Sequence, residues 1–150
     1  MKFDIPRPLK VEHEALHEML RNATKEPGDL GEAAKAVAKL MHPHFVKEEE
    51  YALPPLGLLR DLAQGNVTPD MQEVLMLTDK LKAELGTMLD EHKAIVAALE
   101  KLSTAAKKAD RMEYVKFAEA LMLHAQTEEA VSYPAAILIG EYLREKLRLW

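Results

Sequence analysis

Two copies of one short motif hold the side chains of this sequence that are best suited to chemistry. His44 and Glu48 form a His-x-x-x-Glu pair, and His124 and Glu128 repeat that pair 80 positions later. Residues four apart lie on the same face of a helix, so the imidazole and the carboxylate of each pair can face one centre. Nitrogen and oxygen donors of this kind are suited to binding a metal ion.

Each pair is flanked in the same way. A single histidine lies on an earlier segment, His13 in the first half and His92 in the second, and each follows a glutamate. A proline follows each pair, Pro54 and Pro134, again 80 positions apart. Each half of the chain thus offers two imidazoles and one carboxylate. Two carboxylates that bridge two ions, with two imidazoles on each ion, would form a di-metal site with a position open for a small molecule.

Apolar residues at helical spacing accompany all four histidines, which predicts that the imidazoles point into a core. Buried imidazoles and carboxylates are unfavourable unless they are paired or bound to metal. A duplicated hairpin with only a structural role would keep the spacings. It would not explain why the costly polar residues are the ones that repeat, while Lys47 and Thr127 differ. The flanking residues expected to face inward are Leu9, Leu16, Leu20, Val37, Leu40, Met41, Leu85, Met88, Leu89, Ile95, Leu99, Phe117, Leu121 and Val131.

These observations predict two metal ions held by six side chains. Mixed imidazole and carboxylate ligation suits iron, and manganese or zinc is also possible. The sequence has no cysteine, which excludes thiolate ligands and iron–sulfur clusters. The predicted ligands are His13, His44, Glu48, His92, His124 and Glu128.

Other polar residues near the motifs have weaker expected roles. His17 lies one turn from His13 and is expected to line the site, with direct ligation as the alternative. His42 is expected at the surface or at an interface, and Tyr51 in the core. Most of the glutamates that neighbour the ligands are expected to be solvated; they are Glu14, Glu49, Glu91 and Glu129.

Composition bounds the fold and the classes of function. The chain has 150 residues, of which 48% are hydrophobic and 30% charged, and helix-forming residues dominate. A formal charge of −5 offers no basic surface for nucleic acid. The N-terminal segment lacks the apolar stretch of a signal peptide, and no apolar run reaches membrane-spanning length. We therefore expect a cytoplasmic, all-α protein with no nucleic-acid or membrane partner.

The positions of proline, glycine and capping residues predict four main helices joined by short links, so neighbouring helices should be antiparallel. The repeat pairs the first helix with the third and the second with the fourth. We expect one domain, residues 1–150, folded as an up-down-up-down four-helix bundle with a pseudo-twofold internal repeat. The four main helices are expected from after Pro8 to before Pro27, over 29–53 with a bend at Pro43, over 70–106 and over 110–132. A short extra helix is expected over 56–63, and a terminal helical extension over 135–149.

The sequence resembles hemerythrin-like proteins of the HHE cation-binding type over nearly its whole length. This resemblance implies a hemerythrin-like bundle that holds a non-haem di-iron centre. It also implies that the centre binds or reacts with oxygen, peroxide or nitric oxide, in sensing or in iron and stress handling. The residues that carry the resemblance are His13, the segment from His44 to Glu49 with Leu53-Pro54, Glu91-His92, and the segment from His124 to Glu129 with Tyr133-Pro134.

One difference from the oxygen-carrying hemerythrins affects the expected chemistry. Those proteins have His-x-x-x-His on the third helix, whereas Val96 follows His92 here. They have His-x-x-x-x-Asp on the fourth helix, where this chain has Glu128 four residues after His124. The resemblance therefore favours sensing, iron handling or repair of iron centres over reversible oxygen carriage. Ferritin-like bundles use Glu-x-x-His, in the reverse order and at shorter spacing, and are disfavoured.

Two other functions remain open on the sequence. The chain could be a di-iron oxidase or peroxidase that turns over a small oxidant, or a structural, metal-stabilised bundle that binds a protein partner. Turnover with peroxide separates the enzyme from a sensor. An accessible coordination position separates both from the structural role.

Overall fold

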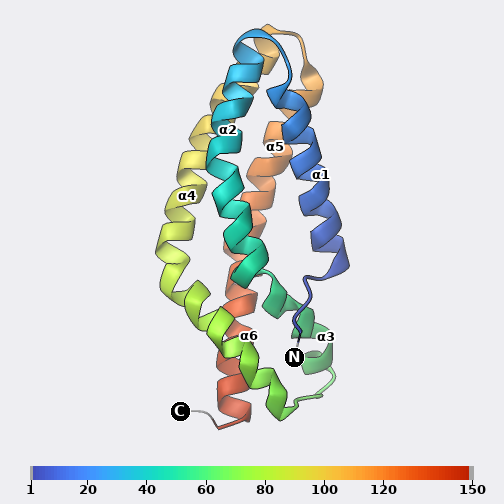
Figure 1. Ribbon diagram of the computed structural model, residues 1–150, viewed down its shortest axis with the longest axis vertical. Coiled ribbons are helices and arrows are strands. Elements are labelled where there is room, and N and C mark those ends of the chain that lie inside the picture. The colour runs from blue at the N-terminus through green and yellow to red at the C-terminus, as the bar shows by residue number, and fades with distance from the viewer. Residues whose placement is uncertain (1, 149–150) are drawn as a thin grey trace.

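Four long helices form the body of the molecule (Figure 1). The computed structural model describes residues 2–148 and contains no strand within that range. The chain runs up, down, up and down, which confirms the expected all-α, hemerythrin-like four-helix bundle (Figure 1). No helix within residues 2–148 is long and apolar enough to cross a membrane. The four helices are α1 (Arg7–Thr24), α2 (Gly28–Lys47), α4 (Leu75–Lys108) and α5 (Met112–Thr127).

A further helix extends the bundle at the end where both termini lie. α6 (Tyr133–Lys146) continues downward from α5 and packs against the lower part of α4 (Figure 1). This is the expected terminal extension, with a start two residues earlier than residue 135. Leu149, the expected end of that extension, lies outside the described residues.

The connection between α2 and α4 covers the same end of the bundle. It contains a 3-10 helix at Pro54–Leu58, then α3 (Leu59–Ala63), then a 3-10 helix at Pro69–Val74. The expected helix over 56–63 is therefore split into a tight turn and a short α-helix. The third long helix begins at Leu75 rather than at residue 70, because the 3-10 turn after Thr68 precedes it.

Two π-helical turns interrupt the α-helical hydrogen bonding at corresponding places in the two halves. They span Glu48–Ala52 after α2 and Glu128–Ser132 after α5. In each turn the N–H of the following residue, Leu53 or Tyr133, donates to the carbonyl of the first residue of the turn, five positions back. Each turn therefore contains one residue more than an α-helical turn. Turns of this kind are rare and are frequently found at functional sites.

Each repeated proline lies one residue beyond Leu53 or Tyr133, the residue that directly follows the π-turn. Pro54 begins a 3-10 helix, and Pro134 lies in the first turn of α6. A proline at the start of a helical segment loses no helical hydrogen bond, because the first N–H groups have no partner within the helix. The prolines 80 positions apart thus mark the restart of helix after each π-turn.

The π-turns correct two expectations about the helices. α-Helical bonding stops at Lys47 and Thr127, whereas the helices were expected to continue to residues 53 and 132. The extra residue rotates the face that points inward, so Val131 is exposed rather than part of the core. Leu40 is also exposed, since it lies at the edge of the inward face of α2. Pro43 lies inside α2 without ending it.

Two apolar clusters fill the molecule on either side of a polar layer. Along α4, the lower cluster ends at Met88 and the upper cluster begins at Ile95, with His92 between them. Phe45 belongs to the upper cluster and Tyr51 to the lower one. Eight polar or charged side chains are buried within the described residues, and the six predicted ligands are among them. The fold therefore places the motifs in one layer inside the bundle.

Candidate metal centre

The four predicted histidines meet as two pairs. His44 from α2 and His92 from α4 place their Nε2 atoms 2.8 Å apart. His13 from α1 and His124 from α5 place theirs 3.1 Å apart. Each pair joins the single histidine of one half to the motif histidine of the other half, and all four side chains are buried. The internal repeat thus produces two equivalent nitrogen pairs.

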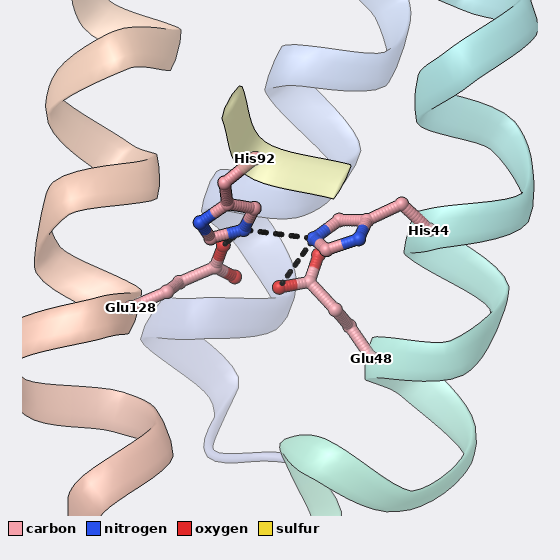
Figure 2. A group of neighbouring side chains, drawn as sticks. All are labelled: His44, Glu48, His92 and Glu128. Carbon is pink, nitrogen blue, oxygen red and sulfur yellow. Dashed lines mark hydrogen bonds and ion pairs between the residues drawn. The ribbon is translucent and has the colours of Figure 1, made fainter. Parts of the chain in front are cut away.

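Glu128 lies between the two pairs and presents one oxygen to each. Its Oε1 lies 3.3 Å from His92 Nε2, and its Oε2 lies 3.1 Å from His124 Nε2. Figure 2 shows Glu128 and Glu48 pointing toward each other from opposite sides, with His92 and His44 above them. A carboxylate in this position can bridge two ions.

Glu48 spans the pairs from the other side. Its Oε2 lies 3.6 Å from His44 Nε2, and its Oε1 lies 3.8 Å from His13 Nε2 (Figure 2). Oε1 is buried and has no hydrogen-bond partner, so a cation would satisfy an otherwise unpaired atom. Two groups in the described part of the chain could each hold an ion: His44, Glu48, His92 and Glu128, and His13, His124 and Glu128.

The spacing of these atoms fits ligand atoms around metal ions. Metal–ligand distances of about 2.1 Å place adjacent atoms of an octahedral site about 3.0 Å apart. The two Nε2–Nε2 distances, 2.8 and 3.1 Å, lie on either side of that value. The residues therefore fit a centre for two ions in donor type, in separation and in burial.

The pKa values of the two carboxyl groups move in opposite directions. Burial, followed by the charge of Glu128, raises the pKa of Glu48 well above its ordinary value. Burial also opposes ionisation of Glu128, but hydrogen bonds from Glu48 and the surrounding histidines hold its pKa well below the ordinary value. Without a cation the pair therefore holds a proton on Glu48. Bound cations would remove the repulsion that keeps it there.

The histidines also show opposite shifts. Burial lowers the pKa of His44, which keeps its imidazole neutral, as metal binding requires. Burial favours the neutral form of His124 too, but hydrogen bonds and charges from Glu128 and Glu12 raise its pKa. A metal ion must therefore compete with a proton at His124.

Carboxylates outside the cluster contact the outer nitrogen of three histidines. A metal-binding imidazole usually donates this Nδ1–H to a carboxylate, which leaves the Nε2 lone pair free to face the metal. The three contacts are Glu91 Oε1 at 3.0 Å from His44 Nδ1, Glu129 Oε1 at 3.2 Å from His92 Nδ1, and Glu12 against His124 Nδ1.

Three of the neighbouring glutamates, Glu14, Glu49 and Glu129, are exposed, as expected for most of them. Glu91 is partly buried against His44. Glu91 is also held by Lys47, whose Nζ lies 2.9 Å from its second oxygen. Glu49 remains more than half exposed, and its Oε1 lies 3.9 Å from His13 Nδ1, too far for a hydrogen bond. The sequence signal for this outer layer is the glutamate that precedes each single histidine and the one that follows each motif.

Most of the chain matches one protein family. The sequence model of the hemerythrin HHE cation binding domain matches residues 4–136. The chain belongs to this family. The comparisons found no match among curated proteins and none among solved structures. Buried histidine and glutamate groups that can hold metal ions are what a cation-binding hemerythrin domain is expected to contain.

Tyr133 is a further member of this hemerythrin cluster. In the sequence it was part of the family resemblance but was not predicted as a residue of the site. Its hydroxyl donates a hydrogen bond to Glu48 Oε2 at 2.6 Å and lies 3.2 Å from Nε2 of both His44 and His92. The π-turn places Tyr133, rather than Ser132, one turn below Glu128. The repeat of Pro54 as Pro134 drew attention to this part of the sequence. It did not indicate that the side chain of Tyr133 points into the cluster.

The remaining predicted residues lie around the hemerythrin cluster. The ring of His17 packs on Phe45, with centroids 4.0 Å apart, and His17 belongs to neither ligand group. His42 is exposed, as expected. Tyr51 is buried in the lower apolar cluster, as expected, and its hydroxyl lies 3.8 Å from the sulfur of Met88.

Substitution of an outer carboxylate is expected to weaken metal binding without abolishing it. In Glu91→Gln the amide loses the charge that supports the His44 imidazole, so metal affinity should fall about 10–100-fold. Competition with a chelator of known affinity measures the change. Asp90→Asn is the control, because Asp90 is adjacent in sequence and highly exposed. Equal affinities in the two variants would exclude a role for Glu91.

Proposed function

We propose that this hemerythrin-family protein binds two metal ions, in the first place iron, with manganese or zinc as alternatives. We further propose that the centre binds or reacts with oxygen, peroxide or nitric oxide, in sensing or in iron and stress handling. The observation that carries the proposal is that each central carboxylate presents one oxygen to each histidine pair. Sharing of both carboxylates gives each ion four ligand atoms, two nitrogens and two oxygens, from only six side chains. The proposed ligands are His13, His44, Glu48, His92, His124 and Glu128.

The residues around the centre prepare it for this chemistry. A pair of iron ions supplies one-electron redox steps and coordination positions open to small molecules. Glu91 and Glu129 orient two imidazoles through their Nδ1 atoms, so that the Nε2 lone pairs point inward. The apolar clusters above and below the polar layer exclude water, which strengthens the electrostatic interactions within it.

A structural role for the metal is the second candidate function. The burial of the whole cluster between two apolar clusters favours it, since a structural ion needs no access to solvent. The alternatives differ in a simple measurement. If the metal is structural, oxygen, peroxide and nitric oxide will leave the visible spectrum of the reduced, iron-loaded protein unchanged. An oxidase would instead consume oxygen, and a peroxidase would consume peroxide, over many cycles.

The metal content tests the proposal directly. Elemental analysis of protein expressed with iron and isolated without chelators is expected to give two ions per chain, because the cluster offers two nitrogen pairs. Measurement of manganese and zinc in the same sample identifies the preferred metal. A content of one ion or none after iron loading would contradict the proposed di-metal centre.

A further inference from the structure

Tyr133 breaks the twofold pattern of the centre. The proposed ligands occur as corresponding residues in the two halves, but the residue 80 positions before Tyr133 is Leu53. Both residues directly follow a π-turn, and both are buried, with 0% and 2% exposure. They therefore occupy corresponding places, and only one of them carries an oxygen. The two histidine pairs consequently have different surroundings.

The phenol oxygen lies where a ligand of one ion would lie. It is 2.6 Å from Glu48 Oε2 and 3.2 Å from the Nε2 atoms of both His44 and His92. Adjacent ligand atoms of an octahedral site are about 3.0 Å apart, so the four atoms have the separations of neighbouring ligands. Every hydrogen-bond contact described for this hydroxyl is to a proposed ligand of the same ion.

The backbone and the lower cluster hold Tyr133 in this position. Its N–H donates to the carbonyl of Glu128, and Pro134 follows in the first turn of α6. Its ring packs in the lower apolar cluster, with its centroid 5.6 Å from that of His92. The hydroxyl is thus the polar end of an otherwise apolar, rigidly placed side chain.

We propose that the phenolate oxygen of Tyr133 is a seventh ligand, bound to the ion between His44 and His92. This inference rests on the proposed di-metal function. As the metal binds, the O–H bond breaks, the proton leaves to solvent and an oxygen–metal bond forms. Leu53 offers no such ligand to the ion between His13 and His124. That second ion therefore keeps one more open position, and the small molecule binds there.

The surroundings of the second pair agree with this assignment. The rings of His13 and His17 both pack on Phe45, with centroid distances of 4.9 and 4.0 Å. His17, Phe45 and Met41 line a surface pocket of about 230 Å³. Only one layer of side chains therefore separates solvent from the ion between His13 and His124. Tyr133 and the lower cluster cover the ion between His44 and His92.

The visible spectrum of the iron(III)-loaded protein tests the proposal. A phenolate bound to iron(III) produces a charge-transfer band, which neither imidazole nor carboxylate ligands produce at the same energy. We expect this band in the wild-type protein, its loss in Tyr133→Phe and its retention in Tyr51→Phe. Tyr51 is the matched control because it is equally buried in the same cluster but contacts Met88 instead of a proposed ligand.

The iron content of the same samples distinguishes a failure of the proposed di-metal function from a failure of the Tyr133 assignment. Wild-type protein that holds no iron would overturn the proposed function. Two irons per chain without a phenolate band, or with a band that survives in Tyr133→Phe, would overturn only the assignment of Tyr133. If Tyr133→Phe does not fold, resonance Raman spectra of wild-type protein with ring-deuterated tyrosine decide. Phenolate vibrations that are enhanced at the wavelength of the band, and that shift to lower frequency in the labelled protein, support ligation. The absence of such vibrations overturns it.

Discussion

Replacement of either central carboxylate, by Glu48→Ala or Glu128→Ala, is expected to remove most of the bound metal. Each carboxylate presents one oxygen to each histidine pair, so one substitution removes a ligand atom from both ions. Loss of an outer partner typically weakens a metal site about 10–100-fold, and loss of a bridging ligand should exceed that range. Elemental analysis after gel filtration measures the iron that remains.

Glu50→Ala is the matched control for these two variants. Glu50 lies in the same π-turn as Glu48, but its side chain is exposed. This variant should retain both ions, and circular dichroism should show that all three variants keep their helices. Equal metal retention in the three proteins would mean that neither central carboxylate is a bridging ligand.

The residues of the cluster could be predicted because two signals coincide in each motif. The four-residue spacing places His44 and Glu48 on one face of a helix whatever the packing. The apolar neighbours then identify that face as the inward one. Neither signal depends on contacts between distant segments. The arrangement of the helices was predictable for a similar reason, since the short links after Thr24 and Lys108 force antiparallel neighbours.

Tyr133 could not be predicted as part of the centre from helical periodicity. An α-helix would place Ser132 one turn below Glu128, whereas the π-turn places Tyr133 there. The choice between the two hydrogen-bond patterns depends on how the surrounding helices pack, which local sequence does not specify. The same shift explains why Val131 is exposed and why the expected helix ends were wrong.

The outer carboxylates were missed for a different reason. Glu91 lies on α4 but contacts a histidine of α2, and Glu129 lies in the π-turn after α5 but contacts a histidine of α4. Such contacts depend on the rotation of each helix about its axis. The sequence shows a glutamate beside each single histidine and after each motif, but it does not show which helix that glutamate faces.

Removal of the metal is expected to lower the melting temperature by roughly 10 °C. A ligand present at about 1,000 times its Kd stabilises the folded state by about 4 kcal/mol. For a chain of about this length, each kcal/mol corresponds to about 2–4 °C in melting temperature. Calorimetry of the iron-loaded protein and of the chelator-treated protein measures the difference. Identical melting curves would contradict a buried centre that binds metal only in the folded state.

In the metal-free protein, Glu48→Gln is expected to raise the melting temperature, although it lowers that of the iron-loaded protein. Burial and the charge of Glu128 raise the pKa of Glu48 in the folded state. A raised folded-state pKa gives stability that is present below the unfolded pKa and is lost as pH rises through the folded value. Glutamine keeps the shape of the side chain without its charge, so it avoids this loss at neutral pH.

The pH dependence separates this explanation from a general gain in packing. The advantage of metal-free Glu48→Gln over the metal-free wild type should shrink as the pH is lowered. The carboxyl group of Glu48 is then protonated in the unfolded chain as well, so folding no longer has to take up a proton. Glu50→Gln, the same chemical change at an exposed position of the same turn, should show no advantage at either pH. A metal-free Glu48→Gln protein that melts below the wild type at neutral pH would show that the buried carboxylate is not the costly group. The destabilisation of the metal-free cluster would then have to arise from its histidines.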